Sequence, residues 1–467
     1  QGASGGPVGL LNVDFINEVD FYSGAFPSNR GNALSSVLDI KFKDGRSDKP
    51  GVAFALGATD LATTFDGPIS PKSTLIASYR RSYLEFLFAA LELPFLPTYN
   101  DFQFKYKIKP DNKQEFTFLG LGAYDVFVLN KEANKTEEQQ YLLGNLPENS
   151  QWNYTLGGSY KRYYEHSYVT MVISRNHLHN RALKYKNNDE SAATNKILDY
   201  ISEEIENKIR LERTTFKNSW KTNVGVNAEQ ATYTNSTFNQ VPNVGTIDYN
   251  SELTFIKYGA FGQISRTFNG AGLVISLGGR LDANTFGNKM KNPLEQFSPR
   301  LSLSKTINER LTFNANTGIY YQLPAYTILG YRDSDNQLQN KNVRYIRATH
   351  FVAGFEYQTK KNARITAEGF LKLYDQYPFG LLDSISIANQ GSDFGVVGDE
   401  PVDSRSNGRA YGIELLYQQK LFKGFYGLVS YTFVRSEFTN LDSKYIASSW
   451  DYRHIISLTA GKTFAKN

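Results

Sequence analysis

The stretch Arg310–Gln322, which reads RLTFNANTGIYYQ, decides the fold class of this chain. Side chains alternate between the two faces of a β-strand. One face therefore carries Leu311, Phe313, Ala315, Ile319 and Tyr321, and the other carries Thr312, Asn314, Asn316 and Gln322. A strand with one apolar and one polar face is typical of a wall between lipid and an aqueous or plugged lumen. The pattern predicts that Phe313 faces lipid and Asn314 faces the lumen.

The same alternation recurs along most of the chain. It places Ile275 and Leu277 on a lipid face opposite Ser276 and Arg280. From residue 51 onward it predicts about eighteen strands of the length that a tilted membrane strand needs. They lie near 51–58, 61–68, 73–82, 101–109, 114–124, 151–160, 166–176, 198–216, 221–232, 253–266, 271–283, 298–306, 310–322, 349–359, 363–374, 408–419, 425–436 and 453–464. The segment 198–216 is charged and shows little alternation of apolar and polar residues. We predict a strand there because each hairpin needs two strands.

Short and long connections alternate strictly between these strands. The short ones carry turn residues, as in Ser70-Pro71-Lys72, Pro110-Asp111-Asn112, Asn269-Gly270, Asn308-Glu309, Lys361-Asn362 and Lys423-Gly424. The long ones are polar and cover 125–150, 177–197, 233–252, 284–297, 323–348, 375–407 and 437–452. A barrel with turns at one membrane surface and loops at the other has this arrangement. The apolar segment 84–96 interrupts the pattern, and we expect a short helix in the lumen or at the membrane interface.

Composition agrees with a membrane barrel. The mean hydropathy is −0.44, and no stretch of about 18 apolar residues exists, which excludes helical membrane spans. The chain has 31 Tyr and 32 Phe but only 3 Trp, a surplus that suits aromatic girdles at the membrane interfaces. The absence of Cys excludes disulfides and thiolate metal sites. The net charge of +5 is small for 467 residues and indicates no nucleic-acid partner.

Residues 1–50 differ from the rest of the chain in their sequence pattern. Two strand-like runs, 19–22 and 37–43, flank a turn rich in Gly, Pro and Asn. This region resembles the end of the plug domain of TonB-dependent outer-membrane receptors. The matching residues are Ile16, Val19, Gly24, Arg30, Gly31, Ser35, Ser36, Val37 and Ile40. Three further segments also resemble this family: Tyr79–Leu84, Phe297–Ser304 and Gly318–Pro324. The sequence is closest to the Bacteroidetes branch of the family.

The resemblance implies an all-β transmembrane antiparallel barrel with a plug remnant in its lumen. Residues 1–50 would be the C-terminal part of the plug, and residues 51–467 a barrel incomplete at its C-terminus. The family barrel has about 22 strands, so roughly two hairpins would follow Asn467. No TonB box and no first half of the plug are present, and we expect an internal piece of a longer protein. Asn32 stands where many relatives have Gly, and Asn tolerates a left-handed backbone.

Several groups of residues have the chemistry of a site but lack the companions that a site needs. His177 and His179 have too few companion ligands for a metal site, and a polar loop is favoured. Asp333, Asp335 and Asn336 lack the Gly and Glu of a calcium loop. Gly57, Gly67 and Gly278-Gly279 lack phosphate-loop spacing, and close packing is favoured. Arg280, Glu368, Lys372 and Glu414 would hydrogen-bond the plug rather than line a substrate path. Loop aromatics such as Tyr326, Tyr331, Tyr345 and Tyr377 could stack on a sugar, siderophore or peptide, but single surface aromatics are common and none is assigned to a site.

We therefore predict no catalytic, cofactor-binding or metal residue, no cofactor and no enzyme activity. The resemblance implies an outer-membrane transporter of a Gram-negative bacterium that imports a siderophore, glycan, peptide or vitamin. Its partners would be TonB, through the missing N-terminal part, outer-membrane lipid and a surface lipoprotein. The alternative is a barrel that anchors a surface or secretion complex and transports little. A passive porin is disfavoured because a diffusion channel has no use for a plug.

Overall fold

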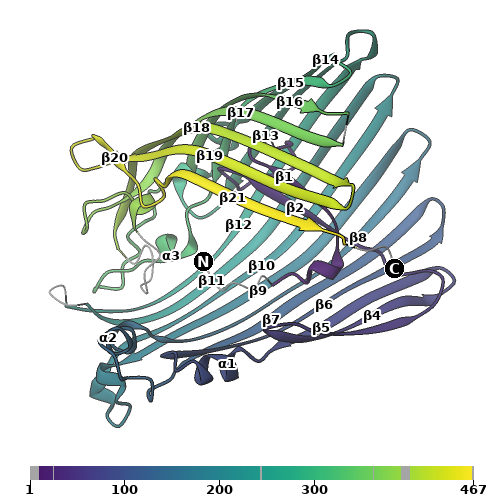
Figure 1. The fold of residues 1–467 in the computed structure, drawn as a ribbon. Coiled ribbons are helices and arrows are strands. Elements are labelled where there is room, and N and C mark those ends of the chain that lie inside the picture. The colour runs from purple at the N-terminus through teal and green to yellow at the C-terminus, as the bar shows by residue number, and fades with distance from the viewer. Residues whose placement is uncertain (1–9, 25, 242–244, 361, 391–399, 465–467) are drawn as a thin grey trace.

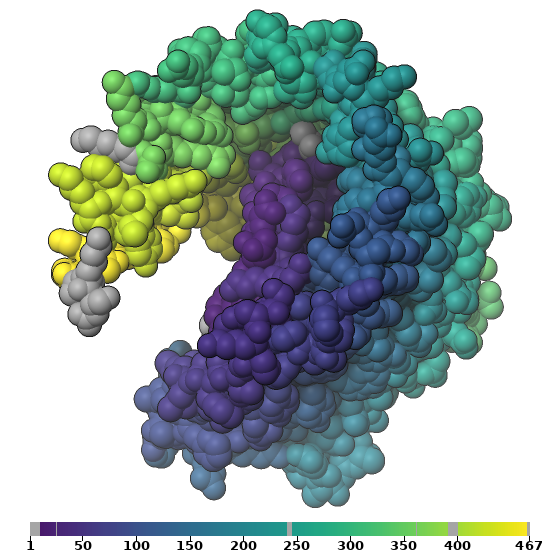
Figure 2. All heavy atoms as spheres, turned by 90° about the vertical axis from the view of Figure 1, so that its right-hand side faces the viewer, coloured from purple at the N-terminus to yellow at the C-terminus, as the bar shows by residue number. Residues whose placement is uncertain are grey.

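The computed structural model describes residues 10–24, 26–241, 245–360, 362–390 and 400–464. A small two-stranded sheet comes first, formed by β1 (Ile16–Tyr22) and β2 (Val37–Phe42). All further strands belong to one antiparallel barrel sheet that curls around this pair (Figures 1 and 2). Figure 2 shows the purple N-terminal segment inside the curve of the sheet. We call residues 10–50 of the structure the plug segment.

The barrel strands follow one another in chain order. They are β3 (Gly51–Leu56), β4 (Asp60–Ser70), β5 (Ser73–Ser82), β6 (Phe95–Asp111), β7 (Gln114–Leu129), β8 (Glu148–Tyr164), β9 (Ser167–Tyr185), β10 (Lys196–Lys217), β11 (Trp220–Val241), β12 (Gly245–Phe268), β13 (Leu273–Asn284), β14 (Ser298–Asn308), β15 (Leu311–Gln322), β16 (Ile346–Gln358), β17 (Ala363–Gly380), β18 (Val402–Phe422), β19 (Phe425–Thr439), β20 (Tyr445–Ala447) and β21 (Arg453–Lys462). Each strand from β3 to β18 pairs with the next, and β19 pairs with both β20 and β21.

Helices are few and short. They are α1 (Leu84–Ala90), α2 (Glu137–Asn145), α3 (Tyr326–Leu329) and the 3-10 turns η1 (Val13–Phe15), η2 (Lys186–Asn188), η3 (Ala193–Asn195), η4 (Asn269–Ala271), η5 (Asn288–Met290), η6 (Pro293–Gln296) and η7 (Ile387–Asn389). No helix within the described ranges is long and apolar enough to cross a membrane. Figure 1 shows α1, α2 and α3 toward the end of the barrel that carries the longer connections, which we call the loop end. The opposite end carries the short turns.

All eighteen predicted barrel strands are present, including the poorly patterned one, which is β10. The predicted loops 177–197 and 233–252 were wrong in extent, because β9 continues to Tyr185, β11 to Val241 and β12 begins at Gly245. The polar run Thr234–Thr237 lies within β11 and pairs with β12 throughout. Outside the membrane a strand does not need one apolar face, so its residues need not alternate between apolar and polar. Backbone pairing with neighbouring strands extends the strand there, and the sequence pattern does not show where the strand ends.

The predicted lipid and lumen faces are confirmed. Phe313 lies beside Phe355 of β16, with ring centroids 5.1 Å apart, and Phe355 is half exposed on the outside of the barrel. The side chain of Asn316, which shares a face with Asn314, points instead toward Gly24 of the plug segment. On β13, Arg280 contacts the plug segment while Leu277 is exposed. Ile275 and Ser276 therefore face lipid and lumen respectively, since they share the parity of Leu277 and Arg280.

The apolar segment 84–96 forms α1, as predicted, followed by the start of β6. Phe86 and Leu91 are 71% and 61% exposed, while Leu84 is buried. Phe88 packs edge-on against Phe95 of β6. The helix therefore does not bury its apolar side chains in the lumen.

Candidate functional site

The plug segment occupies the lumen and turns within residues 23–24 and 26–32, which we call the plug tip. Apolar contacts hold its base, where Phe15 and Phe42 pack against Ile76 on the inner face of β5. Polar contacts with the barrel wall hold the tip. We call this set of contacts the gate, and its chemistry is that of the hydrogen bonds that hold the plug segment in place.

Arg300 of β14 makes the densest set of these contacts. Its Nη1 donates to the carbonyl oxygens of Phe26 (2.9 Å), Pro27 (2.5 Å) and Arg30 (2.9 Å). The guanidinium lies between the rings of Phe26 and Tyr320, 4.9 and 4.7 Å from their centroids. The Arg300 residue is only 8% exposed. A buried cation of this kind is stable because several carbonyl oxygens and two ring faces replace its water.

Arg280 of β13 holds the same tip from the neighbouring strand. Its guanidinium donates to both carboxylate oxygens of Asp282 at 2.6 Å and to the carbonyl of Ser28 at 3.4 Å. A Cβ atom on Gly31 would lie 2.3 Å from Nε of Arg280. The structure therefore explains Gly31 of the Arg30-Gly31 pair, because only glycine lets the tip approach the Arg280 side chain this closely.

The same stretch of barrel wall also holds the tip through β17, which follows β14, β15 and β16 in the sheet. Lys372 donates to the carbonyl oxygens of Ser23 (2.8 Å) and Ser35 (3.0 Å). The Ser23 hydroxyl donates to Glu368 at 3.3 Å. The favoured interpretation of Arg280, Glu368 and Lys372 as residues that bind the plug is confirmed by these contacts. Glu414 lies opposite Glu368 in the β17–β18 register.

A polar plug residue such as Arg30 is expected to contact lumen-facing side chains of the barrel, and its side chain does not do so. Its guanidinium instead forms an ion pair with Asp39 of β2, inside the plug segment. Only its backbone carbonyl reaches the wall, at Arg300. The side chain therefore stiffens the plug segment, and sequence spacing gave no sign that an acidic partner nine positions away would lie beside it.

A second polar network lies in the lumen nearer the loop end, and sequence reasoning missed it. Lys257 of β12 forms ion pairs with Glu206 of β10 at 3.0 Å and with Glu229 of β11. Lys257 also donates to the hydroxyl of Tyr326 at 2.6 Å, and that hydroxyl donates to Glu206 at 2.6 Å. Burial and the neighbouring Glu206 carboxylate raise the pKa of Tyr326, so its phenol stays protonated. Three strands and one loop meet here.

The loop that carries Tyr326 is also joined to the plug tip. The Asn32 side chain accepts a hydrogen bond of 2.8 Å from the backbone N–H of Leu323. Asn32 has φ of 54°, the left-handed conformation that asparagine tolerates, as expected from the sequence. The connection between β15 and β16 therefore links the plug tip with the Lys257 network.

The four tyrosines considered for ligand stacking do not form an open surface. Tyr326 and Tyr345 are 7% and 4% exposed and belong to a core cluster at the loop end. Tyr331 packs edge-on against Tyr249, and Tyr377 against Phe438. Tyr326, Tyr331 and Tyr345 lie in the β15–β16 connection and Tyr377 lies in β17, and all four pack against other rings or core side chains instead of standing free.

The histidine pair is also placed differently from the prediction. His177 and His179 lie within β9, not in a loop, and both approach Glu203 of β10, at 3.4 and 3.1 Å. No group of three ligating side chains suited to a metal was found in the described part of the chain. Asp333 is an ordinary turn residue, since its carboxylate accepts from the backbone N–H groups of Asp335 and Gln337.

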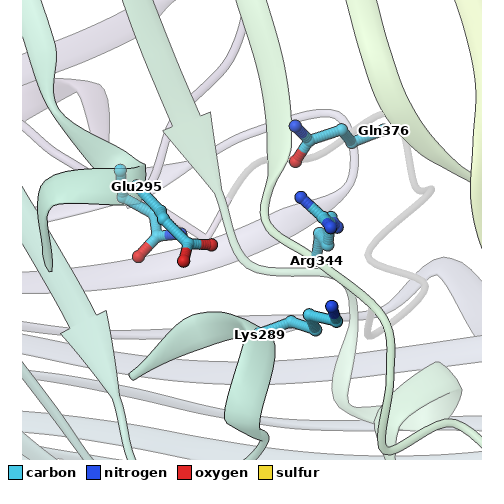
Figure 3. Close-up of a pocket in the computed structure, with 5 residues that line it drawn as sticks. Lys289, Glu295, Arg344 and Gln376 are labelled. Carbon is cyan, nitrogen blue, oxygen red and sulfur yellow. The ribbon is translucent and has the colours of Figure 1, made fainter. Parts of the chain in front are cut away.

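A polar pocket of about 290 Å³ opens among the connections of the loop end (Figure 3). It is lined by Lys289, Glu295, Gln296, Arg344 and Gln376. These side chains come from η5, η6, the β15–β16 connection and β17, so no sequence motif could have joined them. The lining offers two cations, one carboxylate and two amides, which suits a polar ligand with hydrogen-bonding groups of both kinds.

One ion-paired contact of the plug segment gives a pH prediction. Asp44 forms ion pairs with Lys105 (2.7 Å) and Lys107 (2.8 Å) of β6. Burial alone would raise the pKa of Asp44, but hydrogen bonds from the two lysines hold it below its usual value. A depressed carboxyl pKa stabilises the folded contact above the unfolded pKa of about 3.9, and this is lost as pH falls through the lower folded value.

We therefore expect the base of the plug segment to loosen on acidification below about pH 4. Hydrogen exchange of the amides of residues 42–46 measures this. The variant Asp44→Asn should show the loosened exchange already at neutral pH, with no further change in acid. Equal acid sensitivity in the variant and the wild type would contradict the assignment.

The fold and this gate define a plugged outer-membrane barrel, and comparison with known families agrees. Residues 70–461 match the family described as TonB dependent receptor-like, beta-barrel. The chain belongs to this family, which is one of receptors and not of enzymes, and it is an outer-membrane protein. No curated protein matched the chain.

Three solved structures illustrate the likeness. The ferripyoverdine receptor of the outer membrane of Pseudomonas aeruginosa is 13% identical, with a TM-score of 0.71 over 97% of this chain and 64% of the receptor. The copper transporter OprC is 14% identical, with a TM-score of 0.66 over 92% and 68%. The alcaligin outer-membrane receptor FauA from Bordetella pertussis is 12% identical, with a TM-score of 0.64 over 97% and 72%. The chain thus spans less than two thirds of the length of the ferripyoverdine receptor.

Proposed function

We propose that the whole protein imports a scarce nutrient across the outer membrane by an energy-coupled mechanism. The observation that carries this proposal is the way in which the plug tip is held. Arg280, Arg300 and Lys372 bind backbone carbonyls of the tip from β13, β14 and β17 of the barrel wall. These hydrogen bonds are separate contacts that contribute about 1.5–3 kcal/mol each, so a pull on the plug can break them one after another. An apolar interface of the same size would resist separation more strongly.

The division of the chain follows from this. Residues 1–50 form the C-terminal part of a plug domain, and residues 51–467 belong to the transporting barrel. The energy-coupling partner is TonB, which would act on plug sequence outside this chain. The substrate class is a siderophore, glycan, peptide or vitamin. The relatives include a receptor bound to ferripyoverdine and a copper transporter, which favours a metal chelate.

The link between Asn32 and Leu323 supports a receptor role within this function. A ligand that contacts the loop-end connections would shift the β15–β16 connection, and that connection is bonded directly to the plug tip. A surface lipoprotein partner at the loop end is a further element of the proposal. Anchoring of a surface complex is the alternative function.

Whole-cell uptake tests the proposal. Cells that express the full protein are given a panel of radiolabelled ferric chelates, with and without a protonophore and in a strain that lacks TonB. We expect accumulation of at least one chelate that disappears in both controls, and negligible conductance in a planar bilayer. A large ungated conductance would favour a porin. Tight binding of a surface protein, with no energy-dependent uptake, would favour the anchoring role.

A further inference from the structure

The outer face of β6–β12 carries an apolar groove that the transport mechanism does not use. Its volume is about 930 Å³, and apolar side chains dominate its lining, among them Phe118, Leu156, Ile173 and Ile209. Phe118, Leu156 and Ile209 are each 44% exposed and Ile173 is 53% exposed. Ile173 and Ile209 oppose one another in the β9–β10 register. Their neighbours in sequence, Ser174 and Lys208, oppose one another on the lumen side, so the groove faces lipid.

Glycines explain why this face is hollow. The ring of Phe104 covers Gly120 of the next strand so closely that a Cβ there would lie 2.2 Å from the ring. Phe118 approaches Gly158 in the same way, 3.5 Å from its Cβ position. Rings that lie flat over glycines do not stand out from the sheet. The result is a depression with an apolar floor and aliphatic walls.

A cation without a counter-ion stands at the edge of this groove. Arg175 of β9 donates to the Tyr154 hydroxyl (3.1 Å) and to the Asn207 amide oxygen (2.9 Å), which are both neutral. No ion pair joins Arg175 to a carboxylate within the described ranges. The charged groups farther along the same face are paired, as Arg181 is with Asp199 at 3.7 Å. Arg175 therefore keeps an unneutralised charge beside apolar surface.

The depth of Arg175 fits the headgroup level of the leaflet at the loop end. It is the ninth residue of β9, which starts at a short turn at the opposite end of the barrel. At about 3.3 Å per residue and a tilt of roughly 40°, it lies roughly 20 Å from that turn. The apolar band of such barrels is about 25 Å tall. Arg175 thus sits near the outer edge of the band, with most of the groove beneath it.

We infer that this groove binds a membrane lipid with an anionic phosphate headgroup. The acyl chains fill the groove over Gly158 and between Leu156 and Ile209. The phosphate accepts hydrogen bonds from the Arg175 guanidinium, which matches phosphate in charge and geometry. Asn207, which in turn donates to Gln230 at 3.4 Å, adds amide groups to the headgroup site. The occupant is a lipid rather than a soluble anion, because the walls below the cation are apolar.

Tryptophan quenching tests this inference. Trp152 stacks 6.3 Å from Tyr154, the partner of Arg175, and so reports on the headgroup site. In a Trp220→Phe, Trp450→Phe background it is the only Trp of the chain. The full chain in dodecylmaltoside is titrated with phosphatidylglycerol or phosphatidylcholine that carries a nitroxide near the headgroup. We expect half-quenching at a roughly tenfold lower mole fraction of the anionic lipid, the effect of one charge-assisted contact.

Two variants and one control make the result decisive. Arg175→Gln should abolish the preference for the anionic lipid, and Gly158→Leu should weaken the quenching by both lipids. Arg266→Gln is the matched control, because Arg266 lies over the Phe268 ring close to the short turn after β12 and does not line the groove. Heat-modifiable migration in SDS gels confirms folding of each variant. Equal quenching by both lipids in the wild type, or a preference retained in folded Arg175→Gln, would overturn the inference.

Discussion

Replacing Arg300 with glutamine is expected to free the plug tip without unfolding the barrel. Glutamine cannot reach the carbonyl oxygens of Phe26, Pro27 and Arg30 together, and those groups would stay buried without a donor. Hydrogen bonds to charged groups contribute about 1.5–3 kcal/mol each. We therefore expect a loss of about 3 kcal/mol or more from the docking of the tip. Amide exchange at Ser28 and Arg30 should accelerate about a hundredfold.

The measurement is hydrogen exchange of the refolded chain, read by mass spectrometry at peptides across residues 26–32. Amides of β1 and β2 serve as an internal reference, because Phe15, Phe42 and Ile76 hold that part through apolar contacts. Arg266→Gln is the matched control, since it removes an arginine from the outer face. Unchanged exchange at the tip in Arg300→Gln would show that the other contacts suffice. Loss of protection throughout the barrel would show that Arg300 supports the wall rather than the gate.

Arginine at Leu277 is expected to destabilise the barrel by about 2–4 kcal/mol, whereas arginine at the adjacent Ser276 should cost far less. Leu277 is 57% exposed on the outer face and lies near mid-depth of the apolar band, as the fifth residue of β13 after the turn. An arginine there must either lose its hydration or bring water into the lipid, and both cost free energy. Ser276 faces the polar lumen, where its hydroxyl lies 2.6 Å from that of Ser265.

Urea titration of refolding into phosphatidylcholine vesicles measures both free energies. Leu277→Ala separates the loss of apolar contact from the cost of the charge. The expected order of stability is wild type, then Ser276→Arg and Leu277→Ala, then Leu277→Arg. Equal costs at positions 276 and 277 would contradict the assignment of the two faces.

The sequence by itself determined the barrel. The alternation of apolar and polar residues in Leu311–Gln322 depends only on whether each side chain contacts lipid or water. This pattern is therefore visible in the sequence without a structure. The short turns were equally visible, because they carry residue types that favour turns. The Asn308 side chain accepts from the backbone N–H groups of Arg310 and Leu311, and Asn362 and Gly424 adopt positive φ. The resemblance of residues 1–50 to a plug domain also depends on short local motifs, which include Gly31.

Only the tertiary structure decided what holds the gate and what lies on the outside. Arg300 and Phe26 are separated by 274 positions, and Lys257, Glu206 and Tyr326 come from three distant segments. The groove beside Arg175 exists because rings on one strand lie over glycines on the next. Curling of the sheet brings such groups together. Their pairing energies depend on distance and burial, which a linear pattern of apolar and polar residues does not contain.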